Sequence, residues 1–371
     1  GVRDVVVVGA GVIGCSIARE LARRGAGVIV LERDVPGRGA TWAAGGMLSP
    51  LTEASEGGPL LELGDESLRL YPAFAAALLG ETGIDVEYRT GGKLEASLHG
   101  ADAGLRSFAA SPLAARFESV LMDGDAARRL EPSLSAHVTA AVLVERDHRI
   151  NNRLLAEATS AAARSAGAVL RTGCAVEALL IREGAVTGVR LASGEEIDAG
   201  TVVLAAGAWS AKLEGLPRRL PVVPVRGQMF AVDTHAAAWP HALPGRVLAA
   251  ADCYIIPRED GRLVIGATVE HAGFAAGPTP YGIAALLTAA IAVVPAVAEL
   301  PLVETWSGFR PGTPDDLPII GADADVRGLI YATGHYRNGI LLAPITAHCI
   351  AALLSGDAPP VLIDPFSIER F

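Results

Sequence analysis

The sequence predicts an α/β protein in which a Rossmann-type dinucleotide-binding domain is interleaved with an α+β substrate domain built on an antiparallel sheet. The chain opens with an apolar run, a glycine-rich turn and a second apolar run that ends in an acid, as nucleotide-binding βαβ units do. A later region, residues 218–309, alternates strand-like segments with turns, which favours an antiparallel sheet. Because 371 residues exceed the usual size of one hydrophobic core, we expect two domains.

The opening element is predicted residue by residue. Val5–Val8 form an apolar run without polar alternation, as expected of a strand buried on both faces. Three glycines in G-x-G-x-x-G spacing follow it, namely Gly9, Gly11 and Gly14. They permit a tight turn, a close approach of the backbone to a pyrophosphate, and close packing of the next helix on the strand. A second strand, Val28–Leu31, ends in Glu32, whose carboxylate can bind a ribose hydroxyl, so a Rossmann-like unit without a ligand is disfavoured.

The bulk properties exclude several classes of protein. A net charge of −10 and a pI of about 5.3 disfavour a nucleic-acid partner, because no basic surplus is available for phosphates. The four cysteines show no metal-type spacing, so we expect reduced thiols, no metal site and an intracellular protein. The apolar stretches 282–300 and 340–354 are short or interrupted, so we expect no membrane span. Without a recognisable signal peptide, the predicted location is cytoplasmic.

The order of the predicted elements returns to the first domain more than once. Helical patterns at 63–79 and 153–166 and a buried strand at 201–205 belong with it, whereas Asp260–Gly261 marks a hairpin in the second domain. We therefore predict a discontinuous dinucleotide-binding domain of residues 1–84, 146–217 and 310–371, and a substrate-binding domain of residues 85–145 and 218–309.

The motif alone leaves open NAD as a cosubstrate or FAD as a resident group. No second glycine fingerprint is present. The segment GRGATWAAGGMLSP, residues 37–50, favours FAD, because a run of small residues can pass its backbone along a bulky planar ring. The alternative for this segment is a flexible loop without a ligand.

Six segments carry a resemblance to a known family: VVVVGAGVIGCSIA, TWAAGGMLSP, TVVLAAGAWS, CYIIPREDGRLVIGATV, SGFRPGTPDDLPIIG and ATGHYRNGILLAP. In them the chain resembles the D-amino-acid oxidase superfamily of FAD-dependent amine oxidases, and within it most closely the glycine oxidases of thiamine biosynthesis. The segments extend over nearly the whole chain in the family's order. The resemblance implies a Rossmann-type FAD-binding domain and non-covalent FAD, since no cysteine matches the linkage position of some sarcosine oxidases.

Motif and resemblance together predict the residues that contact FAD. Val176 matches the family's adenine contact, and the backbone from His335 to Leu341 is expected along the flavin ring. There a helix N-terminus would suit the negative charge of the reduced ring. The predicted contacts are Gly9, Gly11, Val12, Ile13, Gly14, Glu32, Arg33, Ala40, Thr41, Gly45, Gly46, Met47, Val176, Gly207, His335, Tyr336, Arg337, Asn338, Gly339, Ile340 and Leu341.

The resemblance also implies a substrate site. Arg310 matches the arginine that takes the substrate carboxylate, which a guanidinium can bind through two parallel hydrogen bonds. Tyr254 matches a tyrosine that adds a hydroxyl contact, and Arg337 matches a further position at this site. Without the resemblance, Arg310 would be interpreted as a surface arginine and Tyr254 as a core tyrosine. Arg337 would be interpreted as an arginine that caps a helix or faces a phosphate.

No general base is evident, and none is needed if the amine enters unprotonated. His335 is the only histidine in these motifs, and we expect it to pack on the flavin. Two residues depart from the family pattern: Asp252 replaces a histidine before the tyrosine, and Val269 replaces a methionine after the hairpin. We expect both to reshape the pocket.

The leading prediction is a glycine oxidase-like flavoenzyme. It would convert glycine, sarcosine or D-alanine to the imine, which hydrolyses to the 2-oxo acid, while O₂ becomes H₂O₂ in thiamine thiazole biosynthesis. One alternative is a D-amino-acid or sarcosine dehydrogenase or oxidase of the same fold with another substrate or electron acceptor. Another is a flavin-binding subunit without turnover. The oligomeric state stays open, a homo-oligomer included.

Overall fold

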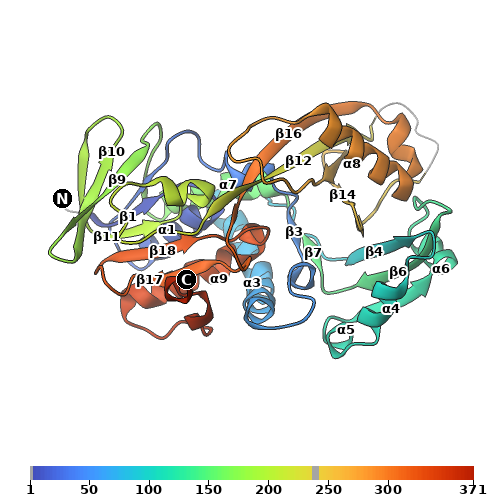
Figure 1. The fold of residues 1–371 in the computed structure, drawn as a ribbon, viewed down its shortest axis with the longest axis horizontal. Helices are drawn as coiled ribbons and strands as arrows, with labels where there is room; N and C mark the ends of the chain where they lie inside the picture. Colours follow the sequence, from blue (N-terminus) through green and yellow to red (C-terminus); the bar gives the residue numbers. More distant parts are fainter. Residues whose placement is uncertain (1–2, 236–241) are drawn as a thin grey trace.

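The computed structural model of the chain describes residues 3–235 and 242–371 and contains two eight-stranded sheets (Figure 1). The first sheet, with the N-terminal strand, occupies the left half of Figure 1, and most of the second sheet lies in the right half. A two-stranded sheet of β3 (Met47–Leu48) and β7 (His148–Arg149) lies between them. The two large sheets confirm the predicted fold class.

The first sheet has the strand order β17-β18-β11-β1-β2-β8, and β10 and β9 continue from β11. Five strands, from β8 to β18, pair in parallel, whereas β17 and the β9–β10 hairpin pair antiparallel. Its strands are β1 (Arg3–Val8), β2 (Val28–Leu31), β8 (Val169–Arg171), β9 (Val176–Arg182), β10 (Ala185–Leu191), β11 (Glu196–Leu204), β17 (Ile319–Ala322) and β18 (Leu329–Thr333).

Alternate residues of β1 face opposite sides of the first sheet. Val5 and Val7 pack in one hydrophobic core with helices α1, α7 and α9, whereas Val6 and Val8 pack in another core with residues of β9, β10 and β11. Because both faces are covered, the strand is apolar throughout, as the opening run predicted. The longer helices are α1 (Val12–Arg23), α3 (Pro59–Thr82), α7 (Asn152–Ser165), α8 (Pro280–Val293) and α9 (Gly339–Ser355).

The second sheet has the order β16-β12-β15-β14-β13-β4-β6-β5. All its pairs are antiparallel except the pair of β13 with β4, so the sheet is not wholly antiparallel as expected. Strands β4, β5 and β6 come from the segment 85–145, as predicted. The strands are β4 (Lys93–Leu98), β5 (Ser119–Asp123), β6 (Val138–Val144), β12 (Val223–Asp233), β13 (Val247–Ala250), β14 (Cys253–Pro257), β15 (Arg262–Gly266) and β16 (Leu302–Gly312).

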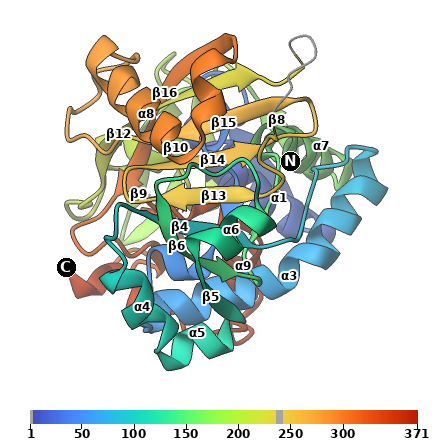
Figure 2. The same cartoon turned by 90° about the vertical axis from the view of Figure 1, so that its right-hand side faces the viewer.

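The two faces of the second sheet have different roles. Phe230 and Val232 of β12 pack with α8 and α6, which lie on the face turned toward the viewer in Figure 2. Met229 and Ala231 point to the opposite face and pack with Trp306. This opposite face looks toward the first sheet and forms one wall of the site described below. The short helices are α2 (Ala40–Ala43), α4 (Ala103–Ala109), α5 (Pro112–Arg116) and α6 (Gly124–Leu130).

Three sequence expectations bear on this fold. The domain boundaries remain predictions. Strand β16 crosses the predicted boundary between residues 309 and 310. All four cysteines are free. Among the described helices, none combines the length and the apolar character that crossing a bilayer requires.

Candidate active site

A cavity of about 430 Å³ lies between the two sheets and is lined by residues of both. This volume is in the range of small-molecule sites. One end lies at the carboxyl ends of β1 and β2 in the first sheet, and we call it the cofactor end. The other lies against β12, β14 and β16 of the second sheet, and we call it the substrate end.

The glycine turn of the cofactor end is packed too closely for larger residues. Gly9 has a φ of +101°, and a Cβ atom there would lie 2.5 Å from the carbonyl oxygen of Ala205. A Cβ atom at Gly14 would lie 1.9 Å from the carbonyl oxygen of Gly9. Gly14 therefore sets the approach of α1 to β1, and it does not line the cavity.

The N-terminus of α1 opens into the cavity. Gly11 is its N-cap residue, has no side chain to cap the helix, and lines the cavity with Val12 and Ile13. No acidic residue lies in the first turn. The N–H of Val12 is satisfied by Thr41 Oγ1 at 3.0 Å, which ties the segment 37–50 to this turn. A helix end of this kind favours an anionic ligand.

Glu32 follows β2 and faces the same end of the cavity. Its Oε2 accepts a hydrogen bond from the N–H of Ala10 at 2.8 Å, and its Oε1 accepts one from the N–H of Asp34 at 3.0 Å. A carboxylate has about four acceptor positions, so two remain for ligand hydroxyl groups. Val176 lines the cavity as well.

The N-terminus of α9 lies at another wall of the cavity. Asn338 is its N-cap residue, and its Nδ2 is buried without a hydrogen-bond partner in the described chain. His335 is 2% exposed, its Nε2 lies 3.1 Å from Thr346 Oγ1, and burial lowers its pKa to about 3. His335 is therefore neutral at physiological pH, and Asn338 keeps an unused donor for a ligand.

Glycines make room where the segment 37–50 meets the second sheet. A Cβ atom at Gly45 would lie 3.0 Å from Tyr254 Cε2, and one at Gly46 would lie 2.1 Å from the carbonyl oxygen of Ile150. Both glycines line the cavity. The backbone of this segment is thus held between Tyr254 on one side and the start of α7 on the other.

Arg310 projects from β16 into the substrate end. Its Nη1 donates to the carbonyl oxygens of Thr268 at 3.0 Å and Arg226 at 3.4 Å, and no carboxylate of the described chain pairs with it. A Cβ atom at Gly227, two residues along β12 from Val225, which pairs with Arg310, would lie 2.5 Å from Arg310 Nη2. The missing side chain therefore gives the guanidinium the space it occupies.

Tyr254 lies on β14 beside this guanidinium. Its hydroxyl donates to Met229 Sδ at 3.7 Å. Burial raises the pKa of Tyr254, and the positive charges of Arg310 and Arg337 act against that shift. The hydroxyl stays protonated at neutral pH and remains a hydrogen-bond donor.

Arg337 differs from Arg310 because it has a carboxylate partner. Its Nε lies 3.0 Å from Oε1 of Glu53, which follows the short helix η1 (Pro50–Thr52). Burial raises the pKa of Glu53, and the charge of Arg337 opposes this. Of the two arginines at the substrate end, Arg310 alone forms no ion pair with a carboxylate of the described residues.

The structure brings the predicted site residues together with two exceptions. Arg310, Tyr254, Arg337 and the predicted cofactor contacts line the cavity, apart from Gly14 and Leu341. Leu341 is 2% exposed in the core beside α3, where its carbonyl oxygen accepts a hydrogen bond from Ser67. Asp252 and Val269 do not line the cavity either, so the expectation that they shape the pocket directly is wrong.

Sequence reasoning did not identify Glu53, Trp209 and Lys212, which also line the cavity. Glu53 lies in an irregular segment without a spacing signal, and only its proximity to Arg337 in the folded chain reveals it. Trp209 lies in the segment TVVLAAGAWS, and Lys212 ends the short helix η2 (Gly207–Lys212) that follows the buried strand β11. A position after a parallel strand is the usual signal for ligand contact.

The cavity fits FAD. The N-termini of α1 and α9, whose N-cap residues make no side-chain cap, the unpaired Asn338 Nδ2 and the free acceptor positions of Glu32 suit a long anionic ligand with hydroxyl groups. Gly37, Gly39, Gly45 and Gly46 of the segment 37–50 line the cavity, so the backbone of this segment borders the space that a planar ring would occupy.

Comparisons with known proteins agree with this fit. A family model described as FAD dependent oxidoreductase matches residues 4–353. The bifunctional protein ThiO/ThiG of Trichormus variabilis is 40% identical over 373 residues, which cover 100% of this chain and 55% of that protein. Glycine oxidase of Pseudomonas aeruginosa is 39% identical over 370 residues, covering 97% of this chain and 96% of the relative.

Similarity also extends to solved structures. The crystal structure of glycine oxidase from Geobacillus kaustophilus matches with a TM-score of 0.94 at 34% identity, covering 100% of this chain and 99% of that chain. The chain spans about half the length of the bifunctional ThiO/ThiG relatives. The family model covers most of the sequence, and the full-length relatives share the whole fold. The chain therefore belongs to the family of FAD-dependent oxidoreductases, which confirms the resemblance and identifies FAD as its cofactor.

Proposed function

We propose that the chain catalyses the FAD-dependent oxidative deamination of glycine and other small amines, sarcosine and D-alanine among them, to the 2-oxo acid. Oxygen would be the electron acceptor and H₂O₂ the second product, in thiamine thiazole biosynthesis. The observation that carries the proposal is Arg310, a cation in the cavity wall that forms no ion pair within residues 3–235 and 242–371 and lies beside a protonated Tyr254. The names of the glycine oxidase and ThiO/ThiG relatives support the same activity.

In this proposal the cofactor end holds the nucleotide part of FAD and the substrate end holds its ring. The turn at Gly9 and Gly11 and the N-terminus of α1 would take the pyrophosphate, and Glu32 a ribose hydroxyl. Residues 45–47 and 335–340 would border the ring. When bound, FAD supplies the acceptor for the hydrogen and electrons that leave the substrate α-carbon.

The substrate-end residues would orient the amino acid. Arg310 would bind the carboxylate with two parallel hydrogen bonds, and the Tyr254 hydroxyl would donate a further one. Because Glu53 already neutralises Arg337, the proposal assigns Arg337 to the shape and charge balance of the pocket rather than to the main carboxylate contact. The α-carbon would then lie on the ring side of the cavity.

The substrate amine has to be unprotonated when its α-carbon loses hydrogen. His335 is neutral and bonded to Thr346, so it does not take up that proton at physiological pH. Glu53 is a carboxylate near both arginines; burial raises its pKa, and the ion pair with Arg337 opposes that rise. We therefore propose that the amine loses its proton to solvent before it enters.

The domain organisation, location and assembly complete the proposal. We assign FAD binding to residues 1–84, 146–217 and 310–371. We assign substrate binding to residues 85–145 and 218–309, and the second of these ranges contains the first residues of β16. A cytoplasmic location is supported by the low cysteine content. A homo-oligomer stays open.

The test is an aerobic peroxide assay with purified yellow protein on glycine, sarcosine, D-alanine and L-alanine, paired with anaerobic spectra. We expect peroxide and bleaching of the flavin with the first three substrates and neither with L-alanine. Bleaching without peroxide would favour the dehydrogenase alternative. A flavin that none of these amines bleaches would favour an enzyme of the same fold with another substrate or the flavin-binding subunit without turnover.

A further inference from the structure

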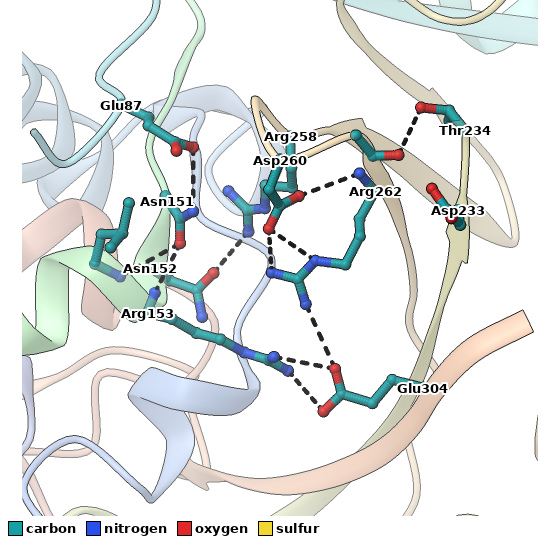
Figure 3. Close-up of polar contacts among 12 residues, drawn as sticks. Glu87, Asn151, Asn152, Arg153, Asp233, Thr234, Arg258, Asp260, Arg262 and Glu304 are labelled. Carbon is teal, nitrogen blue, oxygen red and sulfur yellow. Dashed lines mark hydrogen bonds and ion pairs between the residues drawn. The ribbon is translucent and has the colours of Figure 1, made fainter. Parts of the chain in front are cut away.

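Three arginines gather where the hairpin between β14 and β15 meets the start of α7 (Figure 3). Arg153 binds Glu304 through two hydrogen bonds of 3.0 and 3.2 Å. Arg262 pairs with Asp260 at 2.6 Å and approaches Glu304 at 3.5 Å. Two of the three cations thus have carboxylate partners.

Arg258 is the third arginine, and its hydrogen bonds go to neutral oxygens alone. Its Nη1 donates to the carbonyl oxygen of Ile150 at 2.6 Å, and its Nη2 donates to the carbonyl oxygen of Gly45 at 2.7 Å and to Asn152 Oδ1 at 2.6 Å. Figure 3 shows the Arg258 guanidinium pointing at Asn152. No carboxylate of the described residues forms an ion pair with it, and burial lowers its pKa to about 10.

A desolvated cation without a partner is unfavourable, so its retention calls for an explanation. Arg258 is hydrogen-bonded to Gly45, and both Gly45 and Gly46 line the cavity. Arg258 itself is not one of the lining residues. Its guanidinium therefore lies directly behind the cavity wall at the substrate end, beside Tyr254.

The bond to Gly45 also fixes the direction of the next N–H group. In a trans peptide the C=O and the following N–H point in opposite directions. Since the Gly45 carbonyl points at Arg258, the Gly46 N–H points away from Arg258, and Gly46 lines the cavity. That N–H has no acceptor among the described residues. A buried donor of this kind indicates a ligand acceptor.

We infer that Arg258 is a positioning residue for the flavin ring: it holds the Gly45–Gly46 peptide with its N–H toward the ring, and its unpaired charge favours the reduced, negatively charged ring. A positive charge in a low-dielectric wall lowers the energy of a nearby anion and leaves the neutral oxidised ring unaffected. The inference rests on the proposed orientation of FAD, and it is independent of the proposed substrate.

The test measures the reduction potential of bound FAD without any amine, against a reference dye, in the wild-type holoenzyme and in Arg258→Met. We expect the ratio of reduced to oxidised flavin at a fixed potential to fall about tenfold, or about 30 mV for a two-electron couple. The matched control is Arg262→Met, which removes a carboxylate-paired arginine from the same hairpin and should change the ratio less than about twofold.

An unchanged potential in Arg258→Met, or an equal shift in both variants, would overturn the inference. If Arg258→Met does not fold with FAD, Asn152→Asp carries the test instead. It places a carboxylate at the acceptor 2.6 Å from Arg258 Nη2, so the charge is compensated while Arg258 remains. We expect the ratio to fall in the same direction, and an unchanged ratio would overturn the inference. Because no amine is used, failure here leaves the proposed function untouched.

Discussion

The two ends of the cavity are built in different ways. At the cofactor end, Gly9, Gly11 and Glu32 belong to one continuous βαβ unit, and Glu32 binds the backbone N–H groups of Ala10 and Asp34. At the substrate end, Arg310 and Tyr254 lie on strands of the second sheet, whereas Arg337 and Glu53 come from loops beside the first. The first end is a local structure, and the second exists only in the assembled fold.

This difference implies that the two ends can be disabled separately. A substitution at the cofactor end should change FAD affinity or the folding of the first sheet. A substitution at the substrate end should change substrate handling while FAD stays bound. The predictions below test that separation, from the largest expected effect to the smallest.

The largest effect is expected for Arg310→Ala with glycine as substrate. The substrate carboxylate would be desolvated without its partner, which costs about 3–5 kcal/mol. The kcat/KM for glycine should therefore fall roughly a hundred- to several-thousand-fold, at about 1.4 kcal/mol per factor of ten. Arg310→Lys should recover part of this loss, because an ammonium is a point charge without the planar fork.

The control for Arg310 is a simple amine without a carboxylate, assayed with the same variants. Its kcat/KM should be nearly unchanged by Arg310→Ala. Equal losses for glycine and the simple amine would mean that Arg310 supports the flavin or the fold. The carboxylate contact would then have to be Arg337, after release from Glu53.

At the cofactor end, Gly14→Ala should cost about 3 kcal/mol or more of folding free energy. Its added methyl group would lie 1.9 Å from a backbone oxygen, and neither backbone can move freely. Gly11→Ala is the matched variant, because its Cβ would meet Thr41 Oγ1 at 3.3 Å and the φ of Gly11 is −73°. Urea unfolding of the apoproteins measures the free energy of unfolding, and titration with FAD measures the affinity for the cofactor. We expect Gly11→Ala to fold normally and bind FAD weakly; equal stabilities would contradict the packing role of Gly14.

Glu32→Ala should weaken FAD binding by about 1.5–3 kcal/mol, the usual range for a hydrogen bond to a charged group. Part of the loss would come from the N–H groups of Ala10 and Asp34, which lose their acceptor. Fluorescence titration of the apoprotein with FAD measures it. The kcat with saturating FAD and glycine should stay close to the wild-type value. An unchanged FAD affinity would place the ribose contact elsewhere.

The smallest effect concerns pH. Burial lowers the pKa of His335 to about 3, whereas an unfolded histidine has a pKa of about 6.5. Between these values the unfolded chain binds a proton that the folded chain does not, so stability falls as pH falls. The slope from this group is at most about 1.4 kcal/mol per pH unit. His335→Gln should flatten the decrease in unfolding free energy between pH 6.5 and 5.

A second histidine gives the comparison for this measurement. Burial also lowers the pKa of His148, which lies outside the cavity. His148→Gln should flatten the same pH dependence without changing the FAD spectrum, whereas His335→Gln should change both. Identical pH dependence in wild type and His335→Gln would show that His335 is not held neutral by the fold.

The sequence predicted the cofactor end from local physics. The glycine spacing, the apolar strands and the acid after the second strand each have a steric or hydrogen-bonding reason that holds within about 30 residues of chain. The strand-like segments and the hairpin turn at Asp260–Gly261 likewise indicated β12, β14 and β15. The parallel pair of β13 with β4 was not predicted, because it joins segments that are far apart in the sequence.

The substrate end could be predicted only through the resemblance. Nothing in the spacing of Tyr254, Arg310 and Arg337 indicates that three distant segments meet at one cavity. Glu53 and Arg258 were missed for the same reason, since an ion pair and a peptide clamp become visible only when the chain is folded. The influence of Asp252 and Val269 on the pocket was overestimated, because a departure from the family's sequence pattern does not reveal which way a side chain points.

The most direct test of the separation between the two ends is binding of acetate, the carboxylate part of glycine, to holoenzyme, followed by the visible spectrum of FAD. In Arg310→Ala we expect the Kd for FAD to equal the wild-type value within about twofold, while the Kd for acetate rises at least about a hundredfold, the lower limit of the expected carboxylate contribution. Unchanged acetate binding, or loss of FAD together with acetate, would contradict the account.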